Sequence, residues 1–113
     1  MSHHEPQKYL YDIIDCCEFL INFTLQKTVE NYKNDRAFRS AVERELQIIG
    51  EAIVQLNKTN PDIAEKISEY KNIIGFRNIL VHGYDNLDPI TVWSVIGEKL
   101  RPLLNQCREL IKA

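Results

Sequence analysis

Apolar residues recur at helical spacing along almost the whole chain, and this pattern constrains the fold more than any other feature. They recur three or four positions apart within residues 8–27, 36–57, 70–82 and 88–111. Four glycines and four prolines in 113 residues leave little room for the many tight turns of an all-β sandwich. The sequence therefore predicts an all-α fold, an antiparallel four-helix bundle with one additional short helix.

The breaks between these segments carry signals for helix starts and stops. Pro61 suits the first position of the short helix, which we expect to end near Ser68, and Asp88 suits the N-cap of the last helix. Pro102 interrupts that last helix, so we expect a kink or a break just before it. The polar segment 28–34 is interpreted as a plain connection.

Two features of the helices bear on how they pack. The first helix is apolar on more than one side, so it is either wedged centrally in its own bundle or covered on one face by another subunit. Gly50 lies in the middle of the second helix, where glycine costs about 1 kcal/mol relative to alanine. A close approach of a second helix at Gly50 would explain it.

Length and charge limit the function. The 113 residues predict a single domain, 1–113, with residues 1–7 disordered. The formal net charge of -2 excludes a non-specific polyanion binder, which needs a basic excess. Any nucleic-acid site must therefore be a local concentration of positive charge.

The three cysteines and the hydropathy bear on the compartment. Cys16, Cys17 and Cys107 form neither a disulfide framework nor a metal-ligand spacing, so we expect buried free thiols. No apolar run is long enough to span a membrane, and the N-terminus lacks a signal pattern. We expect a cytoplasmic protein with no metal, no cofactor and no membrane partner.

A group of chemically versatile side chains stands at the end of the third main helix: Arg77, Asn78, His82 and Tyr84. Arg77 and His82 are five residues apart, so on a straight helix they would lie about 140° apart and share no face. Gly83 is the residue type expected at a left-handed C′ position, so the helix should stop at His82. There the chain can swing toward the arginine, whose long side chain covers the remaining distance.

These side chains suit phosphodiester cleavage. Arg77 offers a charged fork matched to phosphate oxygens, and His82 can take or give a proton near neutral pH. RNA carries its own nucleophile in the 2′-hydroxyl, so a base and a cation can suffice without a metal. Asn78 could hold the imidazole or the phosphate, and Tyr84 projects from the same turn.

A purely structural interpretation stands beside this one, and the spacing alone favours it. The helix macrodipole favours a histidine at a helix C-terminus without any catalytic role. Arg77 could pair with Glu51 or Glu69 within the bundle, and Tyr84 could pack at its rim.

Three stretches together resemble the HepT-like toxins, a branch of the HEPN superfamily that is also called the DUF86 family. They are residues 44–52, residues 75–84, and the Val92-Trp93 and Leu100-Arg101-Pro102-Leu103 of the last helix. The middle stretch is close to the family's Arg-x4-His-x-Tyr signature, with asparagine after the arginine.

The resemblance implies a homodimeric helical bundle in which the two copies of the motif meet in a cleft and cleave RNA without metal. Arg77 would then stabilise phosphate charge, His82 would be the acid/base group, and Asn78 would support them.

The resemblance also implies a partner, an MNT-type nucleotidyltransferase antitoxin of a type VII toxin-antitoxin system, and the two proteins can form a larger hetero-oligomer. The antitoxin would transfer AMP to Tyr84. The alternative is a non-catalytic, substrate-binding subunit of a minimal nucleotidyltransferase, which the acidic net charge slightly favours.

Overall fold

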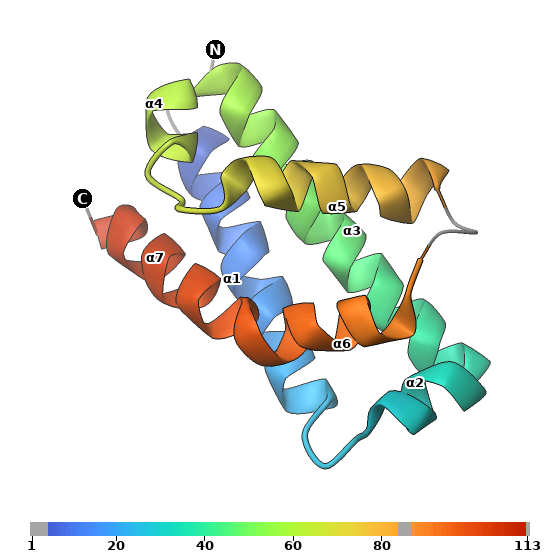
Figure 1. Cartoon of the computed structure of the whole chain (residues 1–113). Coiled ribbons are helices and arrows are strands. Elements are labelled where there is room, and N and C mark those ends of the chain that lie inside the picture. Colours follow the sequence, from blue (N-terminus) through green and yellow to red (C-terminus); the bar gives the residue numbers. More distant parts are fainter. Residues whose placement is uncertain (1–4, 84–86, 113) are drawn as a thin grey trace.

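The computed structural model describes residues 5–83 and 87–112 and shows a bundle of α-helices, with no strand in this part of the chain (Figure 1). In chain order the helices are α1 (Glu5–Phe23), α2 (Val29–Asn34), α3 (Arg36–Thr59), α4 (Pro61–Ala64), α5 (Tyr70–His82), α6 (Pro89–Glu98) and α7 (Leu100–Lys112). This confirms the predicted all-α bundle. Within the described residues, no helix combines the length and hydropathy that a membrane crossing requires.

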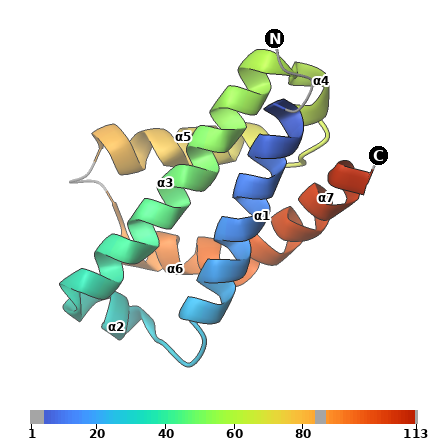
Figure 2. The same cartoon turned by 180° about the vertical axis from the view of Figure 1, so that it is seen from behind.

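The helices form two layers. Helices α1 and α3 lie side by side in one layer, and α5, α6 and α7 cross them in the other (Figures 1 and 2). Helix α1 packs against α3 and also against α7. Of the apolar set on its second side, Cys16 is buried, Tyr9 and Phe23 are partly buried and Phe19 is 43% exposed, so its own bundle covers this side of α1 only in part.

The core consists of apolar side chains from both layers, and burying them is the main source of stability. The side chains that are almost fully buried include Ile13 and Leu20 of α1, Val42 and Ile53 of α3, and Val92 of α6. All three cysteines are free and buried, as expected, and burial raises the pKa of Cys16 and Cys107 to about 12.

Helix α2 corrects the prediction that residues 28–34 form a plain connection. The backbone N–H of Asn31 donates to the Thr28 hydroxyl, and the Thr28 N–H donates to the Asn31 side chain at 2.9 Å. This reciprocal capping box satisfies two donors that a helix start otherwise leaves unpaired. Tyr32 is buried and its hydroxyl donates to Glu43 of α3 at 2.5 Å, so tertiary packing stabilises a helix of only six residues.

Several helix ends differ from the predicted ones. Helix α1 begins at Glu5, so the expected disorder of residues 5–7 is wrong, while residues 1–4 lie outside the described chain. Helix α4 ends at Ala64 instead of near Ser68. The break before Pro102 is confirmed, because α6 ends at Glu98 and α7 begins at Leu100. A proline in the first turn of α7 has no N–H to donate, which suits a helix start.

Candidate functional site

Arg77 lies where α5 crosses α3, and a glycine on α3 makes room for it. A Cβ atom added to Gly50 would lie 2.3 Å from the Cβ and 2.5 Å from the Cγ of Arg77. No ordinary contact between carbon atoms is this short. The close helix approach predicted at Gly50 is therefore confirmed, and the arginine is the residue that needs it.

The guanidinium of Arg77 is held by two neighbours. Its Nη2 lies 3.1 Å from Oε1 of Glu51 on α3, and its Nη1 donates to Oδ1 of Asn78 at 3.0 Å. Its Nε is buried and has no hydrogen-bond partner within the described residues. The arginine is thus oriented by a carboxylate and an amide, and its hydrogen bonding is incomplete within one chain.

Of the two carboxylates considered as partners of Arg77, Glu51 is the one that binds it. Glu69 pairs instead with Lys99 at the junction of α6 and α7, at 3.0 Å. The hydrogen bond from Lys99, with a second from Asn72, holds the pKa of Glu69 below its usual range. The structural interpretation, in which Arg77 pairs with a carboxylate of its own bundle, is therefore correct for Glu51.

His82 is the last residue of α5, as predicted, and its side chain is exposed. The N–H of Gly83 donates to the carbonyl of Ile79 at 2.9 Å, so helical hydrogen bonding continues to the end. The predicted left-handed Gly83 is wrong, since its φ is -110° and the chain leaves α5 without reversing its handedness.

The structure joins some of the predicted site residues and separates others. Arg77 and Asn78 are hydrogen-bonded, but within the described residues no hydrogen bond or ion pair joins either of them to His82. The arginine reaches back to α3, whereas the C-terminal end of α5 projects beyond the flank of α3 (Figures 1 and 2). The expected swing of the chain toward the arginine stays a prediction, because the residues that follow Gly83 lie outside the described chain. Tyr84 lies outside the described residues.

The projecting end of α5 exposes apolar side chains among the motif residues. Ile79 is 42% exposed and Val81 39% exposed, and Ile90 at the start of α6 is 59% exposed. Ile79 lies three positions before His82 and therefore on the same side of α5, whereas Val81, two positions after Ile79, lies on the opposite side. Ile79 is thus the exposed apolar side chain that flanks the motif, and exposed apolar side chains can mark an interaction surface.

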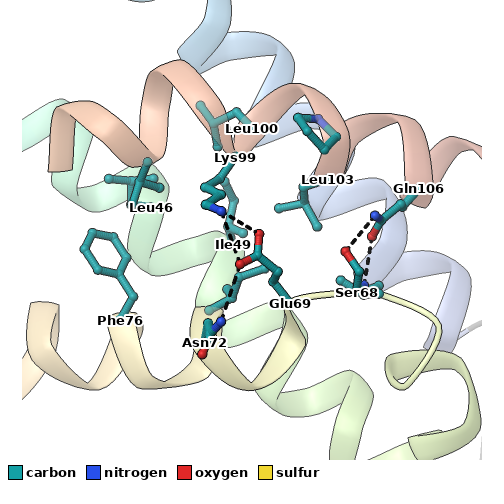
Figure 3. Close-up of a pocket in the computed structure, with 14 residues that line it drawn as sticks. Leu46, Ile49, Ser68, Glu69, Asn72, Phe76, Lys99, Leu100, Leu103 and Gln106 are labelled. Atoms are coloured by element: carbon teal, nitrogen blue, oxygen red, sulfur yellow. Dashed lines mark hydrogen bonds and ion pairs between the residues drawn. The ribbon is translucent and has the colours of Figure 1, made fainter. Parts of the chain in front are cut away.

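A cavity of about 270 Å³ lies between α3, α5 and the α6–α7 junction (Figure 3). Its walls are apolar, with Leu46 and Phe76 among them, and its mouth carries the Glu69–Lys99 ion pair. Neither Arg77 nor His82 lines it. The cavity is therefore separate from the motif, and the helical periodicity of the sequence gave no sign of it.

No group of three or more histidine, cysteine, aspartate or glutamate side chains that could hold a metal ion occurs within residues 5–83 and 87–112. The motif therefore offers a fixed cation, Arg77, and an exposed imidazole, His82. Together they suit an anionic substrate that must lose and gain protons.

Comparison with known proteins gives the relatives of the whole chain. The family model described as "Ribonuclease HepT-like" matches residues 13–110. A Methanocaldococcus jannaschii protein named "Putative RNase" is 32% identical, over 99% of this chain and 92% of the relative. A Caldanaerobacter subterraneus protein of the same name is 32% identical, over 95% of each chain. The "Probable ribonuclease HepT" of Thermococcus cleftensis is 28% identical, over 92% of this chain and 94% of the relative. No solved structure matches the chain.

Proposed function

Because the chain belongs to the ribonuclease HepT-like family of the HEPN superfamily and is an endoribonuclease, we propose that Arg77 and His82 form its cleavage site. The observation that carries this proposal is the contrast between the two residues. Arg77 is fixed at the crossing of α3 and α5, whereas His82 stands exposed at the end of the same helix. A positioned cation and an accessible base are what metal-independent cleavage of RNA needs.

In the proposed reaction His82 removes the proton from a 2′-hydroxyl. The 2′-oxygen then bonds to the adjacent phosphorus, the bond from phosphorus to the 5′-oxygen breaks, and the leaving oxygen takes a proton from an acid. A solvent water molecule can be that acid. Arg77 stabilises the negative charge that builds up on the phosphorus oxygens, and Asn78 orients the guanidinium through their hydrogen bond.

We propose that the working form is a homodimer. One copy alone leaves Arg77 and His82 without a direct interaction, and the exposed Ile79 offers an apolar surface on the side of α5 that carries His82. A two-fold dimer that buries this surface would bring the two motifs together, because an isologous interface contacts the same patch on both copies.

Ribonuclease activity is tested by incubating total RNA with purified protein in EDTA. Wild type and a His4→Ala control, which removes a histidine outside the motif, should cleave, and His82→Ala should not. Because the His82 side chain is exposed, His82→Ala should keep the fold and the oligomeric state. A His82→Ala variant as active as wild type, or strict dependence on Mg²⁺, would refute the mechanism. No cleavage even by wild type, in protein of unmodified mass, would favour the substrate-binding subunit instead.

We propose further that the chain is the toxin of a toxin-antitoxin pair and that an MNT-type nucleotidyltransferase neutralises it by transferring AMP to Tyr84. The adenylyl group would add bulk and negative charge two residues from His82 and would compete with the RNA phosphate for Arg77. Intact mass after co-expression with such an enzyme should show one adenylyl group on wild type and none on Tyr84→Phe. An adduct that survives Tyr84→Phe, or none on wild type, would contradict the proposal.

A further inference from the structure

A second hollow, of about 220 Å³, lies where the turn after α1 meets the α6–α7 junction. Its lining includes Leu25, Gln26, Lys27, Trp93, Gly97 and Arg101. Gln26 has a φ of 62°, a left-handed conformation that costs a non-glycine residue on the order of 1 kcal/mol. This tight turn brings Lys27 to the rim of the hollow, with Arg101 of α7 also on its lining.

The hollow is positively charged. Two of its lining residues, Lys27 and Arg101, are cations, and no described residue that lines it carries a carboxylate. Neither cation forms an ion pair with any residue of the described chain. In the cavity of Figure 3, by contrast, Lys99 is neutralised by Glu69. In a protein of net charge -2, an uncompensated pair of cations beside a hollow favours an anionic ligand.

The hollow also has an aromatic wall. Trp93 is half-buried, and its ring packs against Phe38 and Tyr32 with centroid distances of 6.2 and 6.1 Å. The ammonium of Lys27 lies 5.8 Å from the centroid of the Phe38 ring. Gly97 leaves this side of the hollow open, because a Cβ atom there would meet nothing within 4 Å. A supported indole with free space beside it is suited to stacking on a planar ring.

We propose that this hollow binds one nucleotide of the RNA strand, with its phosphate between Lys27 and Arg101 and its base against Trp93. Cations combined with an aromatic side chain are how proteins hold single strands without reading their sequence. The hollow contains neither Arg77 nor His82, so it holds the strand away from the point of cleavage. The identification of the nucleotide as part of an RNA strand rests on the proposed function, whereas the preference for a phosphate and a base rests on the hollow alone.

Trp93 provides a direct assay because it is the only tryptophan of the chain. We would titrate the protein with a single-stranded 2′-O-methyl oligonucleotide, which cannot be cleaved because its 2′-oxygen carries no proton. Tryptophan fluorescence should be quenched, and more weakly at high salt. Arg101→Gln and Lys27→Gln should each reduce affinity several-fold and lower the salt slope by about one. Lys66→Gln, which removes an exposed cation elsewhere, should behave like wild type.

The assay separates this inference from the proposed cleavage site. Quenching in protein that has no ribonuclease activity would support nucleotide binding in the hollow and would refute only the ribonuclease activity. Cleavage without quenching, or with a KM for RNA unchanged by Arg101→Gln, would refute the hollow alone. If AMP or inorganic phosphate binds as tightly as the oligonucleotide, a free small molecule is the ligand and the assignment to a strand is wrong.

Discussion

Replacing Gly50 with alanine should separate α5 from α3 and displace Arg77 with it. The new Cβ atom would lie 2.3 Å from the Cβ of Arg77. Carbon atoms make contact at roughly 3.5 Å, so the two helices must move apart by about 1 Å. The Arg77 Cβ is part of the stem of the side chain and cannot rotate away, so the backbone itself has to shift.

Two opposing terms set the size of the effect on stability. Alanine gains about 1 kcal/mol over glycine inside a helix, whereas overpacking costs about 1–3 kcal/mol. We therefore expect a loss of up to about 2 kcal/mol in the free energy of unfolding. Activity should fall much further, because a displacement of about 1 Å in a positioned catalytic group can cost on the order of 100-fold.

The matched control is Gly75→Ala, in the same helix as Arg77. A Cβ atom there meets nothing within 4 Å, so this variant should gain about 1 kcal/mol and keep full activity. Urea unfolding followed by circular dichroism, with kcat/KM for RNA in EDTA, measures both quantities. The double change Gly50→Ala with Arg77→Gly moves the glycine to the other helix and should restore stability but not cleavage. If Gly50→Ala were as stable and active as Gly75→Ala, the role assigned to this crossing would be refuted.

Three further outcomes follow from the charges and thiols. Glu51→Gln removes the carboxylate that competes with phosphate for Arg77, so the KM for RNA should fall. The free energy of unfolding should change by less than about 1 kcal/mol, and an unchanged or higher KM would contradict this prediction. Because Lys99 lowers the pKa of Glu69, the stability that this pair contributes is present above the usual carboxyl pKa and is lost as pH falls through the lowered one. Glu69→Gln should therefore flatten the acid limb of urea midpoints below about pH 4.5. Burial raises the pKa of Cys107 to about 12, so the stability that its protonated thiol contributes is present below pH 9 and is lost as pH rises toward 12. In urea unfolding over that range, Cys107→Ala should lose roughly 1 kcal/mol less per pH unit than wild type.

The main helices were predictable because their signals are local. Apolar periodicity, the proline at position 61, Asp88 as an N-cap and the break before Pro102 all act within a few residues. Helix α2 was missed because part of its stabilisation is not local. Its capping box uses Asn31 where glutamate or glutamine is usual, and Tyr32 is anchored by Glu43, eleven residues further on.

The difference between local and long-range signals also decides which parts of the site could be predicted. Arg77, Asn78 and His82 lie within one helix, so these residues could be named from the sequence, and Gly50 indicated a close helix contact. Which carboxylate binds Arg77 depends on how α5 crosses α3, and no local pattern determines that angle. The positively charged hollow joins Lys27 to Arg101, which are far apart in the chain, so only the folded structure could place them together.

If the cleavage site is shared between two copies, two inactive variants should restore activity in a mixed dimer. A site within one copy would not allow this. Arg77 is held against α3, and His82 stands on the projecting end of α5. If each cleavage site takes its arginine from one copy and its histidine from the other, inactive Arg77→Ala and His82→Ala chains should complement each other. Refolding the two variants together would yield mixed dimers, each with one intact site, so a 1:1 mixture should recover about a quarter of wild-type activity.

The control for complementation is the same mixture prepared without unfolding, which should stay inactive for as long as the dimers do not exchange subunits. Refolding His82→Ala with Asn78→Ala/His82→Ala provides a second control, since no pairing of these chains contains a histidine at position 82. If the Arg77→Ala and His82→Ala mixture stayed inactive despite mixed dimers shown by mass, both residues would have to act from the same copy. The RNA itself would then have to bridge Arg77 and His82 of one copy, because the structure leaves these two side chains without a direct interaction.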